Sequence, residues 1–157
     1  MRRVALTEFL TFGSLGPIRL GLTPADVESK CGPPADTSMP QLPRIWSYGA
    51  LQVTFLNSAT TQCEELALIG IYFRMQHKPL FGSTRGIKAT GWWPTTTTNY
   101  DDFVAYLQSN EIEWSIASEL TFETQTTLCM PSGVHVGFDK EHSPILLDSM
   151  QFAGQEK

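Results

Sequence analysis

Apolar residues recur at helical spacing close to the start of the chain. Leu6, Phe9 and Leu10 fall at positions i, i+3 and i+4, which predicts a short amphipathic helix over residues 4–12. Gly13 follows and can end this helix. We expect its apolar side to lie against the core.

The segment after residue 20 holds the boundary signals of a second helix. Thr23 can cap its N-terminus, Pro24 suits the first helical position, and Asp26 can return a hydrogen bond to the cap as in a capping box. Gly32, followed by proline, then ends the helix. These signals place the helix between Pro24 and Gly32.

The next apolar positions change to the spacing of strands. Residues 45–49 and 51–55 alternate with period two and predict a hairpin. Residues 66–73 are almost wholly apolar, which predicts a central strand covered on both faces. Residues 76–98 are rich in glycine, proline and threonine and predict a long loop, with a short strand near residues 87–90.

The strongest helical pattern in the chain lies after residue 98, where four apolar residues occupy positions i, i+3, i+4 and i+7. They are Tyr100, Phe103, Val104 and Leu107. Thr98 or Asn99 can cap this helix. Four further strands are predicted beyond it, over residues 112–117, 120–130, 134–138 and 145–152.

The two halves of the chain follow the same order of helix, hairpin turn and apolar strand. The alternating run at residues 51–55 also matches that at residues 134–138. We therefore predict an α+β fold of two tandem helix-plus-three-strand units, at about residues 18–75 and 98–152. The units would share one mostly antiparallel sheet with the helices on one face, and residues 76–97 would link them within a single domain of residues 1–157. The alternative is a coincidence that any α+β chain could give.

Composition and charge restrict the class of partner. Apolar residues make up 41% and charged residues 17% of the 157 residues, which excludes a disordered chain. Residues 1–89 carry nine Lys and Arg against six Asp and Glu, a net charge of +3, whereas residues 90–157 carry two against ten, a net charge of −8. Phosphate backbones and anionic lipids repel a protein this acidic. We therefore expect a basic protein as partner, and neither nucleic acid nor a membrane. The alternative is that the acidic surface only confers solubility.

The cellular location is inferred from the N-terminal residues and the cysteines. Arg2 and Arg3 precede apolar residues, but polar residues interrupt the run that a signal peptide requires. The three cysteines are widely spaced, as buried thiols are in a reducing compartment. We therefore expect a cytoplasmic protein.

One pair of side chains could carry chemistry. Cys129 and His135 flank a turn at residues 131–133 and could face each other across a hairpin, but structural zinc requires four ligands. The sequence contains no nucleophile elbow, Walker motif or dinucleotide-binding glycine motif. We therefore expect no metal site, no cofactor and no enzymatic activity. A Cys–His pair that meets only in the fold stays open as the alternative.

Aromatic and acidic residues after position 90 form the candidate contact surface for a partner. Trp92 and Trp93 cannot both face inward, and Trp beside acids is typical of a protein-binding hot spot. The candidate contact residues are Trp92, Trp93, Tyr100, Asp101, Asp102, Glu111, Glu113 and Trp114. The alternative for the Trp pair is that it clamps the linker against the two units. Trp46, Tyr48 and Trp114 alternate with polar residues on strands, which leaves two interpretations: they line one exposed sheet face, or they fill the core.

Several of these motifs also carry a resemblance to known families. In the first half they are Gly21-Leu22-Thr23 through Val27 to Gly32-Pro33, Trp46-Ser47-Tyr48-Gly49, Leu51-Gln52-Val53-Thr54-Phe55 and Leu68-Ile69-Gly70-Ile71. In the second half they are Leu120-Thr121-Phe122 with Gln125-Thr126-Thr127-Leu128, and Ser132-Gly133-Val134 to Phe138-Asp139. Together they resemble the tandem-repeat modules of β-lactamase inhibitor proteins and outer-membrane assembly lipoproteins. They look closest to cytoplasmic immunity proteins of bacterial toxin systems.

The resemblance implies a function. The chain departs from the lipoproteins in having no lipobox and from the secreted inhibitors in having no paired cysteines. What the resemblance then implies is a protein that neutralises a toxin or an enzyme by direct binding inside the cell. Two alternatives remain: a small-molecule-binding or hydrolytic protein that uses His135 with Cys129 or an acid in a pocket, and a structural partner in a homo-oligomer, suggested by the apolar run 66–73.

Overall fold

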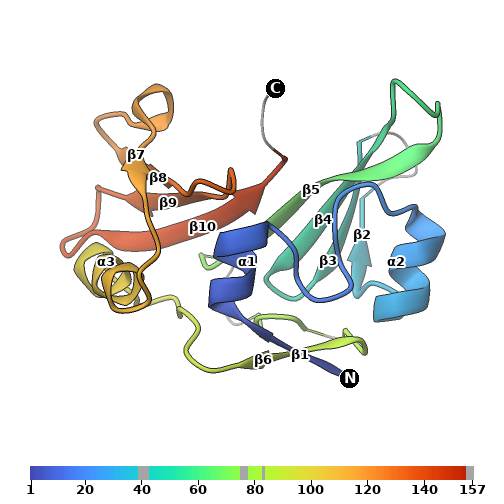
Figure 1. Ribbon diagram of the computed structural model, residues 1–157, viewed down its shortest axis with the longest axis horizontal. Coiled ribbons are helices and arrows are strands. Elements are labelled where there is room, and N and C mark those ends of the chain that lie inside the picture. Colours follow the sequence, from blue (N-terminus) through green and yellow to red (C-terminus); the bar gives the residue numbers. More distant parts are fainter. Residues whose placement is uncertain (39–42, 75–77, 83, 155–157) are drawn as a thin grey trace.

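The structure is a computed structural model that describes residues 1–38, 43–74, 78–82 and 84–154. Within these residues the chain forms helices α1 to α3, a 3-10 turn η1 and strands β1 to β10 (Figure 1). Their bounds are β1 Arg2–Ala5, α1 Leu6–Phe12, α2 Pro24–Cys31, β2 Asp36–Thr37, β3 Arg44–Tyr48, β4 Leu51–Asn57, β5 Glu64–Tyr72, β6 Ile87–Thr90, α3 Tyr100–Ser109, β7 Ser115–Ile116, η1 Ser118–Leu120, β8 Gln125–Cys129, β9 His135–Asp139 and β10 Leu146–Phe152. None of the described helices is long and apolar enough to cross a membrane.

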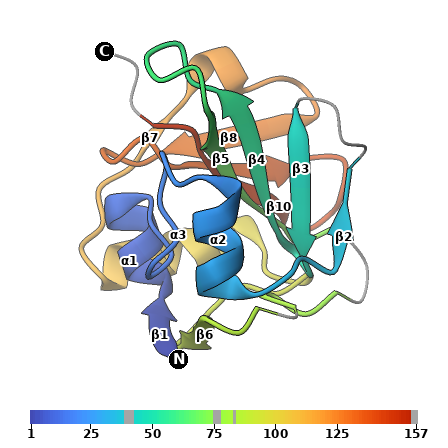
Figure 2. The ribbon, with the colours of Figure 1, turned by 90° about the vertical axis from the view of Figure 1, so that its right-hand side faces the viewer.

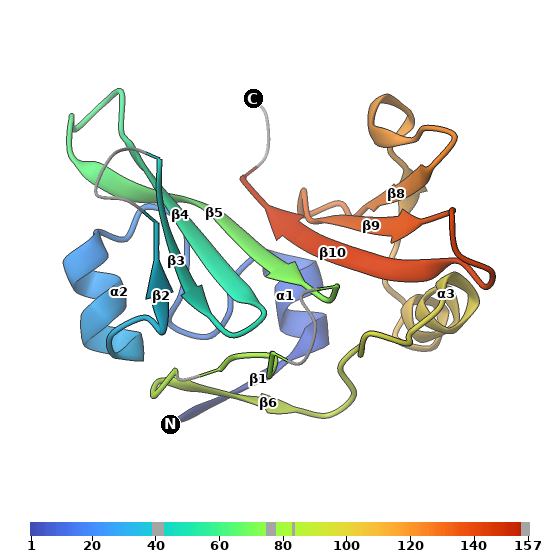
Figure 3. The same ribbon diagram turned by 180° about the vertical axis from the view of Figure 1, so that it is seen from behind.

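Eight strands form one sheet in the order β2-β3-β4-β5-β10-β9-β8-β7, and every neighbouring pair is antiparallel. The strands of the first half occupy one side of this sheet and those of the second half the other (Figure 3). The halves meet where β5 pairs with β10, with Tyr72 opposite Ser149 and Ile69 opposite Phe152. The α+β class and the mostly antiparallel sheet are thus confirmed. Each half supplies four strands rather than the three of the predicted unit. β2 was not predicted because it has only two residues, and of the strand predicted over residues 112–117 only the two residues of β7 are in the sheet.

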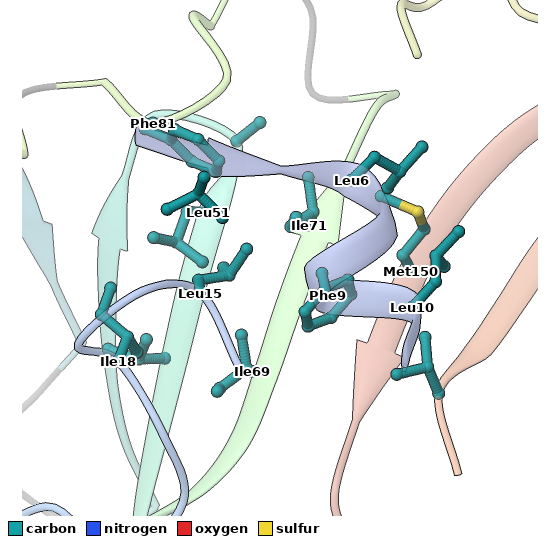
Figure 4. Packing of buried hydrophobic residues seen from close by; sticks show 14 of the residues in the cluster. Leu6, Phe9, Leu10, Leu15, Ile18, Leu51, Ile69, Ile71, Phe81 and Met150 are labelled. Atoms are coloured by element: carbon teal, nitrogen blue, oxygen red, sulfur yellow. The ribbon is translucent and has the colours of Figure 1, made fainter. Parts of the chain in front are cut away.

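All three helices pack on the same face of the sheet (Figure 2). Phe9 of α1 lies over Ile69 and Ile71 of β5 and near Met150 of β10 (Figure 4). The inward side chain of Tyr48 on β3 donates a hydrogen bond of 2.9 Å to the Gly32 carbonyl at the end of α2. In the second half of the sheet, the ring centroids of Phe103 in α3 and Phe138 in β9 are 5.6 Å apart. One continuous core therefore fills the space between the helices and both halves of the sheet.

The ends of the helices follow the sequence signals closely. The Thr23 hydroxyl accepts a hydrogen bond from the Asp26 amide, and the Asp26 carboxylate accepts one from the Thr23 amide, which completes the predicted capping box. Asn99, rather than Thr98, caps α3 by accepting from the Asp102 amide at 2.8 Å. Gly13 ends α1 in the left-handed conformation. These helix ends could be predicted because their capping hydrogen bonds join residues that are close in sequence.

The N-terminal residues differ from the prediction of a helix over residues 4–12. Residues Arg2–Ala5 form strand β1, which pairs in parallel with β6, and the helix begins only at Leu6. The pairing buries Val4 and Ile87, two residues whose sequence separation hides the contact from any local pattern. Strand β6 lies within the range predicted near residues 87–90, so the segment assigned to the linker also contributes to the core.

Two strand predictions differ from the structure in detail. The run 120–130 was predicted as one strand, but it holds the end of η1, a turn and then β8. The second face of β5 is only partly covered, since Leu68 and Tyr72 are half-buried. The central position of β5, between β4 and β10, accounts for its apolar run.

Candidate functional site

Trp92 lies on the surface of the acidic half, against helix α3. Its ring is tilted by 31° to that of Tyr106 with 4.6 Å between the centroids, and the Phe103 ring is 6.4 Å away. The side chain is 41% exposed. Burial raises the pKa of Tyr106, and the backbone of Thr7 partly opposes this rise. Tyr106 therefore stays a neutral, half-buried platform beneath an exposed indole.

A hollow of about 440 Å³ opens beside this aromatic pair, and we call it the α3 groove. Trp92, Thr95, Thr97 and Thr98 form one wall, and Asp102, Ala105, Tyr106 and Ser109 of α3 form the other. Asp102 is exposed, and its place in the first turn of α3 is fixed by the Asn99 cap. The structure thus brings the predicted contact residues Trp92 and Asp102 into one concave surface.

Trp93 points the other way, into the molecule. Its indole donates a hydrogen bond of 3.2 Å to the Val4 carbonyl. Its ring and the Phe81 ring form a T-shaped contact with 5.2 Å between the centroids. It therefore holds strand β1 against residues 78–82 from the side. The two readings of the Trp pair each describe one member: Trp92 faces outward and Trp93 acts as a clamp.

Tyr100 and Asp101 belong to a different hollow. With Asn99 and residues 142–145 they line a space of about 230 Å³ at the start of α3. The Tyr100 ring packs edge-on against Phe138 at 5.0 Å, whereas Asp101 is exposed. This hollow is separate in its lining residues from the α3 groove.

The remaining predicted contact residues lie between α3 and β7. Glu111 and Glu113 are exposed, and Trp114 is half-buried against the core. Trp46 and Tyr48 face the core, at 7% and 0% exposure, and are not on the surface. Of the aromatic residues singled out from the sequence, only Trp92 combines high exposure with a concave setting.

Cys129 and His135 do face each other across the β8–β9 hairpin. They are direct partners in the strand register, and their inward neighbours Leu128 and Val136 are fully buried, so both point away from the core. With Glu119, Leu120 and Gly154 they line a shallow space of about 770 Å³, which we call the Cys129–His135 trough.

Cys129, His135 and Glu119 are the residue types that a cysteine hydrolase uses, but the thiol and the imidazole are not hydrogen-bonded to each other. The Cys129 thiol donates to the Met130 carbonyl at 3.4 Å rather than to the imidazole. Within the part of the chain that the structure describes, no group of three or more His, Cys, Asp or Glu side chains is placed to hold a metal ion. The arrangement offers a thiol and an imidazole on one open floor, with Glu119 at the rim.

Three exposed apolar residues in and after β7 were not among the contact residues predicted from the sequence. Ile116, Leu120 and Phe122 are 55%, 39% and 59% exposed. The run 120–130 was predicted as a strand, and a strand pattern offers a buried face for such residues. Leu120 and Phe122 lie between Glu119 and Glu123 in the sequence, and these flanking acids are the signal that could have indicated an exposed segment.

Comparisons of the chain with known protein families, with curated proteins and with solved structures found no match.

Proposed function

We propose that the protein binds and neutralises another, basic protein through its acidic half, as an immunity protein or inhibitor in the cytoplasm does. The observation that supports this best is the α3 groove, where the exposed Trp92 rests on Tyr106 beside Asp102. An aromatic anchor held in place before binding loses little conformational entropy when a partner covers it. Acidic groups around such an anchor attract a basic partner and orient it.

The distribution of charge supports the same assignment. The net charge of −8 over residues 90–157 is carried by α3, β7 to β10 and their connections, which form one side of the molecule. A patch of one sign raises the association rate with a partner of opposite sign, by an amount that falls as salt is added. The first half, at +3, offers no such attraction to a basic protein.

The proposal includes an origin of the fold by duplication of one unit. In each half a capped helix precedes four strands, and the last strands of the two halves are neighbours at the centre of the sheet. Leu51, Val53 and Phe55 of β4 and Val134, Val136 and Phe138 next to or within β9 are all fully buried, as equivalent positions of two related units would be.

The experiment uses the proteins encoded next to this chain in its genome, because immunity proteins and their toxins are expected to be neighbours. Each neighbouring product is purified, and its binding to the chain is measured by calorimetry at two salt concentrations. We expect one basic neighbour to bind and to lose its activity in the complex. The Trp92→Ala variant should bind at least about tenfold more weakly, since a central Trp is a frequent hot spot.

Leu56→Ala is the matched control, because Leu56 is 46% exposed and lies on β4, in the strands of the first half. It should bind like the unchanged protein. Equal affinity of the Trp92→Ala variant and the unchanged protein would remove the α3 groove from the contact surface. Absence of binding by every basic neighbour would overturn the proposed function.

A second candidate function is binding or hydrolysis of a small molecule in the Cys129–His135 trough. The observation that favours it is the convergence of a thiol, an imidazole and a carboxylate on one space of about 770 Å³, a size typical of ligand sites. Activated esters and thioesters provide the test, with Cys129→Ser and His135→Ala as variants. Turnover that both variants abolish would support a hydrolase, whereas turnover that is equal in all three proteins would exclude this pair.

A further inference from the structure

The segment that contains η1 and leads into β8 exposes apolar side chains on an ordered backbone. We call residues 117–125 the docking loop; Figures 1 and 3 show it in orange beyond the end of the sheet, beside β7 and β8. Leu120 and Phe122 at its centre are 39% and 59% exposed. Glu119 and Glu123, next to them in sequence, are exposed as well.

Side chains hold the backbone of the docking loop at several points. The Leu120 carbonyl accepts hydrogen bonds from the Thr127 hydroxyl at 2.7 Å and from the Gln125 amide at 3.2 Å. The Thr121 hydroxyl donates to the Ala117 carbonyl at 2.9 Å. The Lys140 ammonium group donates to the Phe122 carbonyl at 3.1 Å. The loop therefore presents Leu120 and Phe122 from a fixed frame instead of sampling many conformations.

Exposed apolar side chains are concentrated in this part of the surface. Seven large hydrophobic residues are exposed within the described chain, and three of them, Ile116, Leu120 and Phe122, fall within seven residues of sequence. Scattered exposed apolar residues are normal, but a cluster on a rigid frame is typical of a surface that a partner covers. Binding to a frame that is already ordered requires little further loss of conformational entropy.

We propose that the docking loop binds a segment of a partner protein that carries both positive charge and apolar side chains. Phe122 and Leu120 would be buried in the contact, and Glu119 and Glu123 would face the partner's lysines or arginines. The inference rests on the proposed function and adds to it a second contact surface, distinct in its residues from the α3 groove. A second copy of the same loop is a poor occupant, because it would bring four carboxylates together.

The probes are three labelled synthetic peptides of equal length: one of lysine and leucine, one of lysine and serine, and one of glutamate and leucine. Their binding to the full chain is measured by fluorescence anisotropy. We expect the lysine–leucine peptide to bind about tenfold more tightly than the lysine–serine peptide, because only the former can cover apolar surface. The glutamate–leucine peptide should not bind, since the loop is acidic.

The decisive variant is the double substitution Leu120→Ala with Phe122→Ala, and its matched control is Leu56→Ala with Phe12→Ala. Leu56 and Phe12 are exposed by 46% and 69% and lie outside the docking loop, on β4 and at the end of α1. The loop variant should bind the lysine–leucine and lysine–serine peptides equally weakly, whereas the control should keep the tenfold preference. Because all four residues are exposed, both variants should keep the circular dichroism of the unchanged protein.

Two outcomes would overturn the docking loop. The first is a loop variant that keeps the preference for the lysine–leucine peptide. The second is an unchanged protein that binds the glutamate–leucine peptide as tightly as the lysine–leucine peptide. Neither outcome decides the proposed function, because that is tested by the neighbouring protein and by Trp92→Ala. Loss of binding to the neighbouring protein in Trp92→Ala but not in the loop variant would retain the function and discard the loop.

Discussion

At the scale of single residues, Trp92 and Trp93 show how one step along the backbone separates a surface role from a core role. Trp92 covers Tyr106 from outside, and Trp93 donates a hydrogen bond to the Val4 carbonyl from within. Composition cannot distinguish the two, because both follow the same glycine and precede the same proline. Only the packing of β1 against residues 78–82 decides which indole is enclosed.

Replacing each tryptophan should therefore have opposite effects on stability and on binding. Trp93→Ala should lower the free energy of unfolding by about 2 kcal/mol, since it removes a half-buried ring and its hydrogen bond. Trp92→Ala should lower it by less than about 1 kcal/mol, because 41% of the residue is already exposed and, within the described part of the chain, it makes no hydrogen bond to the core comparable to that of Trp93. Urea unfolding followed by circular dichroism measures both values. A larger loss for Trp92→Ala than for Trp93→Ala would contradict the assigned roles.

Cys31 gives a pH dependence whose sign can be worked out. Burial raises the pKa of its thiol from 9.0 to about 11, with a small opposing effect of Lys30. Below pH 9 the thiol is protonated in both states, so the free energy of unfolding is unaffected. Above pH 9 the unfolded chain loses this proton first, so stability should fall by about 1 kcal/mol between pH 9 and pH 10.

The control for this effect is Cys31→Ala, which should be less stable overall but should show a smaller decline between pH 9 and pH 10. Burial also raises the pKa of Tyr48, Tyr72 and Tyr106 from an ordinary value of 10.0, so their contributions begin at the upper end of this range and grow above pH 10. Denaturant midpoints at half-unit intervals of pH measure the decline. An identical decline in the variant would assign it to other groups.

At the scale of elements, the β3–β4 turn and residues 78–82 lock together. The Ala50 amide donates to the Pro79 carbonyl at 3.0 Å, and the Leu51 amide donates to the Leu80 carbonyl at 3.1 Å. Gly49, at the turn, has a φ of +69°, and a Cβ there would collide with the Pro79 carbonyl oxygen. This close approach ties the first half of the sheet to the connection between the halves.

Gly49→Ala should consequently be much more disruptive than an ordinary glycine substitution in a turn. Gly91→Ala is the matched control, because Gly91 has a φ of +71° but open space around its Cα. The control should cost about 1 kcal/mol, the strain of the left-handed conformation alone. Gly49→Ala should cost at least about 3 kcal/mol, since backbone must also move. Thermal unfolding of both variants tests the difference.

The elements that could be predicted from the sequence are those held by neighbouring residues. The Thr23–Asp26 capping box defines α2, and the spacing of Phe103 and Leu107 defines α3. The β1–β6 pair could not be predicted, because its partners are more than eighty residues apart. The docking loop was missed for a different reason: Leu120 and Phe122 fit a strand pattern and are instead exposed. Asp102 of the α3 groove could be predicted, because the helical spacing of the apolar residues places it in the first turn of α3.

At the scale of the whole molecule, the two halves share one core and one group of charged side chains. Arg74, just after β5, forms an ion pair with Asp139 at the end of β9 and contacts His142 Nε2 at 2.8 Å. Its guanidinium also lies 3.8 Å from Asp148 of β10. The residue therefore links the strands of the first half to those of the second.

This shared core predicts a single unfolding transition. Amide exchange should show the same protection free energy for the most protected amides of β4 and β9, one from each half. Tryptophan fluorescence and far-ultraviolet circular dichroism should give coincident urea curves. Two separated transitions, or strands of one half that exchange well before those of the other, would show that the halves unfold independently.

The short strands at both borders of the large sheet bear on how the protein behaves when concentrated. β2 and β7 form these borders and are only two residues long each. A strand from a neighbouring molecule would gain very few hydrogen bonds by adding to either border, which disfavours growth of the sheet into fibrils. Aggregation of the folded protein should therefore proceed through side-chain contacts, and exposed residues such as Phe122 are the first positions to replace when more concentrated samples are needed.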